Sequence, residues 1–87
     1  MDRLQYITRE INNLYKNVSN INIENIYVIK SKYLDLNKKL KNTHFLIFEN
    51  TQKHQLLKKM KLINQKIIEI EFEEDTLLHK KSFQYRL

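Results

Sequence analysis

The sequence predicts an α+β domain in which two helices cover one side of a small sheet, a two-layer arrangement. Two observations favour strands. Residues 68–73 alternate strictly between apolar and acidic side chains, which is the period of a half-buried strand. Residues 45–48 form a short, wholly apolar block with two aromatic rings, as buried strands do. A third observation favours helices, because apolar residues recur every three or four positions in two other segments.

The first predicted helix covers residues 3–18. Its apolar side consists of Leu4, Ile7, Ile11, Leu14 and Val18. These intervals of three and four residues place all five side chains on one face of a helix. Asn and Ser residues crowd residues 17–25. Because Asn competes for backbone hydrogen bonds and tolerates turn geometries, we expect the helix to end there.

Residues 26–36 are compatible with two structures. The β-branched and aromatic run at residues 26–29 favours a strand. The same region also fits one seam of a coiled-coil helix, with seam positions Ile26, Ile29, Tyr33, Leu36 and Leu40. Polar residues then offer a turn at 37–43, before the apolar block that we expect to form the second strand.

The second predicted helix covers residues 52–66, where Leu56, Met60, Ile63 and Ile67 form one face. After the alternating strand at 68–73, we expect a short helix over 75–79 and a final strand over 83–87. The alternative is an all-α helical hairpin or coiled coil with one very long second helix. It requires both apparent strand segments, 45–48 and 68–73, to be helical against their local preference.

Composition indicates the genome rather than the fold. The chain has 87 residues, enough for a single small domain over residues 1–87, and it contains no Gly, Pro, Cys, Trp or Ala. Those residue types have GC-rich codons, whereas the abundant Lys, Asn and Ile have AT-rich codons. The composition therefore indicates an AT-biased genome. We expect a mitochondrion or another organelle, or otherwise the cytoplasm of an AT-rich parasite or of a virus-infected host.

Several classes of chemistry lack the residues that they need. Without Cys there is no disulfide framework and no thiolate metal site, and His44, His54 and His79 do not have the spacing of zinc ligands. Without Gly there is no phosphate-binding loop, and no Ser has a nearby His–acid pair. No apolar run approaches the length of a membrane span. We therefore expect a protein that is not an enzyme and binds no cofactor or metal.

The net charge of +6 is concentrated in one segment. Residues 37–66 carry eight Lys and one acid, whereas residues 67–75 carry five acids and no base. A field of this strength attracts a polyanion, and we expect a nucleic acid, whose phosphates Lys can neutralise. The predicted nucleic-acid-binding residues are Lys38, Lys39, Lys41, Lys53, Lys58, Lys59 and Lys61. The alternative is that these Lys form a solvated surface.

From residue 43 onward, the chain resembles the family of the tenth small-subunit ribosomal protein. In that family an apolar strand precedes a Lys-rich helix, followed by a basic–apolar–apolar–acid–apolar segment and a short final strand. The matching segments here are residues 45–48, 52–65, 66–70 and 83–87, and the helix at 3–18 corresponds to the family's first helix. The resemblance implies an α+β fold and contact with ribosomal RNA.

Two functions follow from these observations. The first is a non-catalytic, basic subunit of a large ribonucleoprotein, in its most concrete form a divergent organellar small-subunit ribosomal protein that contacts ribosomal RNA and takes part in translation. The alternative is a helical coiled-coil structural subunit of a multiprotein assembly. In that case the seam positions would be Leu4, Ile7, Ile11, Leu14, Ile26, Ile29, Tyr33, Leu36 and Leu40.

Overall fold

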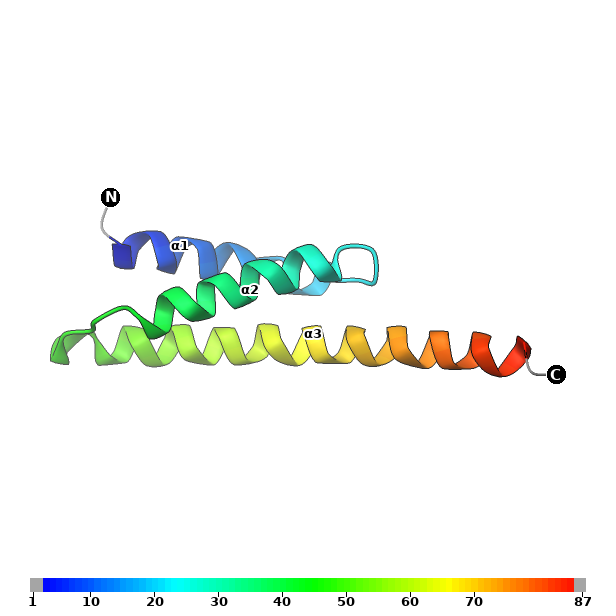
Figure 1. Cartoon of the computed structure of the whole chain (residues 1–87). Coiled ribbons are helices and arrows are strands. Elements are labelled where there is room, and N and C mark those ends of the chain that lie inside the picture. The colour runs from blue at the N-terminus through cyan, green and yellow to red at the C-terminus, as the bar shows by residue number, and fades with distance from the viewer. Residues whose placement is uncertain (1–2, 86–87) are drawn as a thin grey trace.

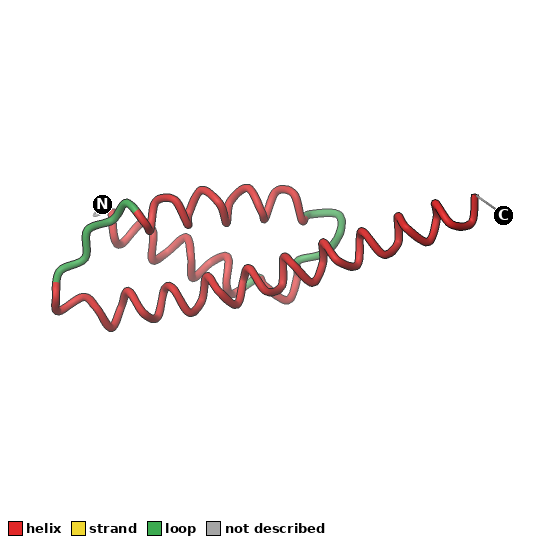
Figure 2. Tube along the Cα trace, turned by 60° about the horizontal axis from the view of Figure 1, so that its bottom comes forward, coloured by secondary structure: helices red, strands yellow, loops and turns green. Residues whose placement is uncertain are grey.

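Helices and turns make up the computed structural model, which describes the backbone of residues 3–85 and the side chains of residues 3–75. The α-helices are α1 (Arg3–Lys16), α2 (Ile26–Lys41) and α3 (Asn50–Tyr85) (Figure 1). Each connecting loop contains a short 3-10 turn, η1 (Val18–Asn20) or η2 (Ile47–Glu49). No residue from 3 to 85 lies in a β-strand (Figure 2). The α+β prediction is therefore wrong, and the all-α alternative fits.

The hairpin of α1 and α2 packs along one side of α3. Thr8 and Asn12 of α1 contact Gln52 and Lys59 of α3 in the same order, so α1 and α3 run parallel. Tyr27 and Lys30 of α2 contact Glu74 and Glu71 of α3, in the reverse order, so these two helices are antiparallel. With 36 residues, α3 is about 54 Å long, and it continues past the hairpin at its C-terminal end (Figure 1). The molecule is consequently elongated, measuring 61 × 20 × 20 Å.

Apolar side chains from all three helices form a single core. Among the described side chains no polar or charged residue is buried. The buried residues are Leu4, Ile7, Ile11, Leu14, Ile21, Ile26, Leu36, Leu40, Leu56, Met60, Ile63, Ile67 and Ile70. The apolar side predicted for the first helix is confirmed, because its first four members are buried and Val18 packs against the core. The face predicted for residues 52–66, with Ile67, is also buried throughout.

The segment at residues 26–36 is helical, so the strand prediction for residues 26–29 is wrong. Within α2, Ile26 is buried and Ile29 packs against the core, whereas Tyr27 and Val28 are exposed. All five seam positions of the coiled-coil alternative face the core of this single chain. Only the helical period lets all of them reach the same side, which explains why helix prevails over the local preference for strand.

The apolar block at residues 45–48 is a loop that leads into η2, and the strand predicted there is wrong. Phe45 packs against the core, but Ile47 and Phe48 are 90% and 83% exposed. A strand needs a neighbouring strand to satisfy its backbone groups, and the nearest candidate, residues 26–29, is helical. Glu49 fixes the turn instead, because its Oε1 accepts a hydrogen bond from the Leu46 N–H at 2.9 Å.

Residues 68–73 lie within the uninterrupted helix α3, so the clearest strand prediction is wrong. Ile67 and Ile70 continue the three- and four-residue spacing of the core, whereas Ile68 and Phe72 are exposed. A helix satisfies its own backbone hydrogen bonds without a partner strand. The short helix predicted at 75–79 is also part of α3. Residues 83–85 are helical rather than extended, and residues 86–87 lie outside the described range.

Asn side chains hold the loop between α1 and α2, as their crowding predicted. Asn22 Oδ1 accepts hydrogen bonds from the N–H groups of Glu24 at 2.9 Å and Asn25 at 3.1 Å. The Asn25 side chain also forms two hydrogen bonds. Its Oδ1 accepts one from the Asn22 N–H at 2.8 Å, and its Nδ2 donates one to the Asn20 carbonyl at 3.0 Å. This reciprocal network reverses the chain without a Gly and directs Ile21 and Ile26 into the core.

Candidate nucleic-acid interface

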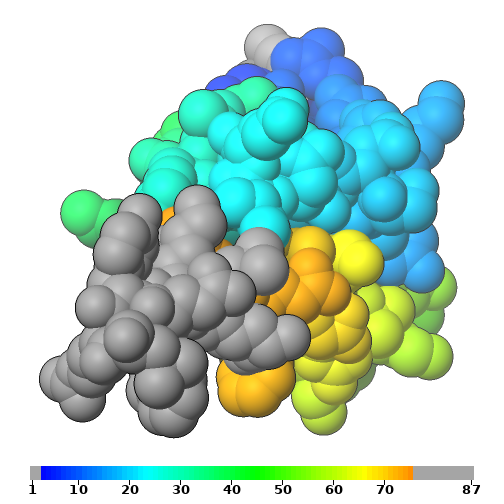
Figure 3. All heavy atoms as spheres, turned by 90° about the vertical axis from the view of Figure 1, so that its right-hand side faces the viewer, coloured from blue at the N-terminus to red at the C-terminus, as the bar shows by residue number. Residues whose placement is uncertain are grey.

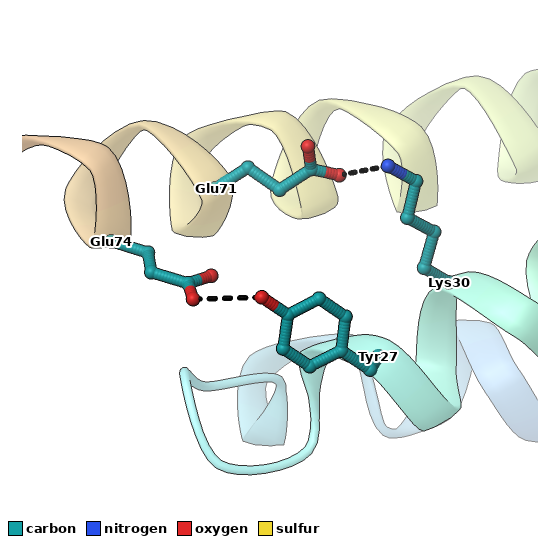
Figure 4. Close-up of polar contacts among 4 residues, drawn as sticks. All are labelled: Tyr27, Lys30, Glu71 and Glu74. Atoms are coloured by element: carbon teal, nitrogen blue, oxygen red, sulfur yellow. Dashed lines mark hydrogen bonds and ion pairs between the residues drawn. The ribbon is translucent and has the colours of Figure 1, made fainter.

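The α2–α3 contacts fix the relative position of the Lys residues. Tyr27 donates a hydrogen bond to Glu74 Oε1 at 2.9 Å, and Lys30 Nζ lies 2.9 Å from Glu71 Oε1 (Figure 4). Viewed from the C-terminal end, the loop after α1 and the start of α2 lie on one side of α3 (Figure 3), and the Tyr27 and Lys30 contacts place the start of α2 level with residues 71–74. The opposite end of α2 therefore lies beside the first half of α3, where most of the Lys residues occur.

Basic residues from all three helices consequently gather toward one end of the molecule, here called the basic end. A surface hollow lined by Arg3, His44, Leu46 and Glu49 shows that the start of α1 meets the loop before α3. The basic end comprises Arg3, Arg9, Lys38, Lys39, Lys41, Lys53, Lys58, Lys59 and Lys61. The acidic cluster of residues 69–75 lies toward the other end of the hairpin. The two charge blocks seen in the sequence thus remain separated along the long axis.

Lys39 is engaged in contacts within the chain. Its Nζ lies 3.0 Å from Asp35 Oδ2, one turn earlier on α2, and 5.3 Å from the centre of the Tyr6 ring on α1. The hydrogen bond to the Asp35 carboxylate raises the pKa of Lys39 above its ordinary value. Part of its charge is therefore already balanced, and its side chain joins α1 to α2.

Lys53 and Lys59 also pack against other parts of the chain. Lys53 Nζ lies 5.7 Å from the centre of the Phe45 ring, in cation–π range. Lys59 Nζ donates to Asn12 Oδ1 at 2.6 Å and lies 5.7 Å from the Tyr15 ring centre, so it joins α3 to α1. Three of the seven predicted binding residues therefore have structural contacts that compete with binding of a ligand.

The other four, Lys38, Lys41, Lys58 and Lys61, are exposed, and we call them the four-lysine face. None of them forms an ion pair with a side chain in residues 3–75. Helical periodicity places Lys38 and Lys41 on the side of α2 that carries Lys30. Lys61 lies about 80° around α3 from Glu71, on the outward side of that helix, and Lys58 lies next to it one turn earlier.

The level of these lysines along the bundle follows from the same contacts. Because α2 and α3 are antiparallel and have equal rise per residue, the Lys30–Glu71 pair puts Lys38 level with residue 63 and Lys41 level with residue 60. Lys61 lies between those levels. Lysines that are 17 to 23 positions apart in the sequence therefore converge on one face, where a polyanion could contact them together.

Sequence reasoning missed one feature of the basic end. The apolar block was assigned to the core, but Ile47 and Phe48 are on the surface. The signal was present in Glu49, whose carboxylate can close a turn on the residue three positions earlier.

No grouping of three or more His, Cys, Asp or Glu side chains that could hold a metal occurs within the described part of the chain. In that part there is also no helix with the length and hydropathy needed to cross a membrane. Comparison with protein-family models, with curated proteins and with solved structures finds no match to this chain.

Proposed function

We propose that this protein is a non-catalytic RNA-binding subunit of a large ribonucleoprotein and that the four-lysine face contacts the phosphate backbone. The observation that supports the proposal is the convergence on one face of exposed lysines from α2 and α3, none of which forms an ion pair within residues 3–75. Lys is a flexible point charge, suited to neutralising phosphates without reading sequence. The protein would therefore bind by charge and position rather than by base recognition at this face.

The concrete form of the proposal is a divergent organellar small-subunit ribosomal protein that contacts ribosomal RNA. The AT-biased composition and the Lys-rich first half of α3 support it. Within residues 3–85, the segments through which the sequence resembles that ribosomal family are helix, loop or turn in this protein. The proposal accordingly depends on the four-lysine face and not on the resemblance.

Fluorescence anisotropy with two RNA oligonucleotides of unrelated sequence tests the proposal. The test variant replaces Lys38, Lys41 and Lys61 by Gln. The matched control replaces Lys16, Lys32 and Lys66, which lie outside the face, so both variants lose the same charge. At 0.1 M salt the test variant should bind both RNAs about a hundredfold more weakly, from about fivefold for each of the lost phosphate contacts. The control should lose less than about threefold. Equal losses would show that only net charge matters, and would refute the proposed face.

A second function is favoured by the outward side of α3. The seam residues predicted for a coiled coil on α1 and α2 are occupied within the chain, but Leu57, Ile68 and Phe72 are exposed on α3. The charge of α3 changes from basic to acidic after Lys66. A second copy of the chain, packed antiparallel, would place the basic half of each α3 against the acidic half of the other. The protein would then be a helical structural subunit of a multiprotein assembly.

Cross-linking separates this second function from the first. An antiparallel pairing through this apolar face, centred on residues 64–65, puts Leu57 of one copy level with Phe72 of the other, and His54 level with Asp75. Because the chain has no Cys, a mixture of the variants His54→Cys and Asp75→Cys should form a disulfide-linked heterodimer under mild oxidation. Either variant alone should remain largely uncross-linked. Absence of the heterodimer, together with a monomer in sedimentation velocity, would rule out this pairing.

A further inference from the structure

Ile47 and Phe48 form an exposed apolar tip at the basic end. They are more exposed than any other large apolar side chain among the described residues. The tip lies in the turn that precedes α3, at the extremity of the molecule opposite the projecting end of α3 (Figure 1). Single exposed apolar residues are common on protein surfaces, but adjacent ones at a protruding turn indicate contact with a partner.

The turn that carries the apolar tip is held on both sides. The Glu49 N–H donates to the Leu46 carbonyl at 2.9 Å, in addition to the hydrogen bond that the Glu49 carboxylate accepts from Leu46. On the N-terminal side Phe45 packs against the core, and Thr43 Oγ1 donates to the Lys39 carbonyl at 2.7 Å. Because its neighbours are anchored, the tip cannot fold back onto the core without breaking these contacts.

Basic side chains lie beside the residues that carry the apolar tip. Arg3 and His44 share a surface hollow with Leu46, and Lys53 lies over the Phe45 ring. Glu49 is the acid nearest in sequence, and its carboxylate already accepts the Leu46 N–H. An aromatic and an aliphatic side chain within a basic surface complement a ligand that has both apolar faces and negative charge.

We infer that the tip binds unstacked bases of single-stranded RNA, with Phe48 as the stacking platform and Ile47 as an apolar contact beside it. This inference rests on the proposed RNA-binding function and adds the class of RNA, namely a loop, a bulge or a free end. Aromatic side chains stack on bases that are splayed out of a helix, and lysines nearby hold the backbone. In a duplex the bases are stacked on one another and leave no face for Phe48.

The test compares Phe48 variants on two RNA probes, a single-stranded oligonucleotide and a duplex of equal length. Phe48→Ala should weaken single-strand binding about 5- to 150-fold, the usual effect of losing one stacked base. It should change duplex binding by less than about twofold, as phosphate contacts are unaffected. Phe48→Trp should retain single-strand affinity. The matched control is Leu34→Ala, which removes an exposed apolar side chain from the middle of α2 and should have no effect.

A second readout uses the same Phe48→Trp variant. The natural chain has no Trp, so the variant contains a single Trp, at the tip, whose emission can be excited selectively over that of Tyr. Stacking on a base should quench its emission when the single-stranded probe is added, and addition of duplex should leave the emission nearly unchanged.

The possible outcomes distinguish this inference from the proposed function. If the natural protein binds single-stranded RNA and Phe48→Ala binds it equally well, the inference is refuted while the proposed function stands. If the natural protein binds neither probe, the proposed function itself fails. If the tip variants instead lose co-sedimentation with vesicles containing phosphatidylserine, with RNA binding unchanged, the tip is a membrane contact and the inference is overturned.

Discussion

Replacement of Ile67 by Ala should destabilise the protein strongly, whereas the same change at the neighbouring Ile68 should have little effect. In α3 the Ile67 side chain is 2% exposed and the Ile68 side chain is 57% exposed. The strand predicted at residues 68–73 would have buried Ile68 instead, alongside Ile70 and Phe72. The two substitutions remove the same atoms from adjacent positions, so their difference reports which face is buried.

The expected magnitudes follow from burial. Ile→Ala removes three carbon atoms, which corresponds to about 2.4 kcal/mol of transfer free energy at about 0.8 kcal/mol per buried methylene. The cavity at Ile67 adds to this, giving about 3 kcal/mol. At Ile68 less than half of this transfer free energy is lost, because more than half of the side chain is already exposed. The better helix propensity of Ala compensates for a few tenths of a kcal/mol of that loss. The free energy of unfolding should therefore fall by about 0.5 kcal/mol for Ile68→Ala.

Urea denaturation followed by far-ultraviolet circular dichroism measures both values, and equal slopes would show that the unfolded states are comparable. A domain of this size has only a few kcal/mol of stability, so Ile67→Ala could unfold. Ile67→Val then provides the comparison, with an expected loss of about 1 kcal/mol. If Ile68→Ala proved more destabilising than Ile67→Ala, the continuous helix would be refuted at this point.

Two further predictions concern polar contacts. The hydrogen bond that Tyr27 donates to the Glu74 carboxylate raises the pKa of the Tyr27 phenol. This hydrogen bond stabilises the folded protein at pH values below about 10, the ordinary pKa of Tyr. The stabilisation is lost as the pH rises through the higher pKa that Tyr27 has in the folded protein. Ultraviolet titration of a variant with Tyr27 as its only Tyr should therefore show a lower pKa after Glu74→Gln, and an unchanged pKa would show that this contact is not formed. Asn25→Ala removes two side-chain hydrogen bonds of the α1–α2 loop and should destabilise the protein by about 1 kcal/mol, a decrease of about 4–8 °C in Tm. An unaltered thermal transition would contradict the structural role given to the Asn network.

Local pattern predicted the first helix but misassigned the second half of the third. Between residues 3 and 18 no other period competes with the helical one. At residues 68–73 the alternating pattern is genuine, but Ile67 and Ile70 also fit the spacing set by Met60 and Ile63. Which period prevails depends on whether a partner strand exists, and a sequence window does not contain that information.

The sequence indicated which lysines to consider for the candidate site, but not how the helices arrange them in space. All four members of the four-lysine face were among the predicted residues. The roles of Lys39, Lys53 and Lys59 depend on where Tyr6, Phe45 and Tyr15 lie, and therefore on how the helices pack. The exposure of Phe48 similarly depends on a turn closed by Glu49, whereas apolar content alone predicts burial.

The salt dependence of RNA binding tests the central claim most directly. If four lysines contact phosphates of a single strand, the logarithm of affinity should fall with the logarithm of salt concentration with a slope of about −2.8, from about 0.7 per contact. Replacing Lys38, Lys41 and Lys61 by Gln should reduce the slope by about two units, whereas replacing Lys16, Lys32 and Lys66 should change it by less than one. An unchanged slope in the first variant, or equal changes in both, would contradict binding through the four-lysine face.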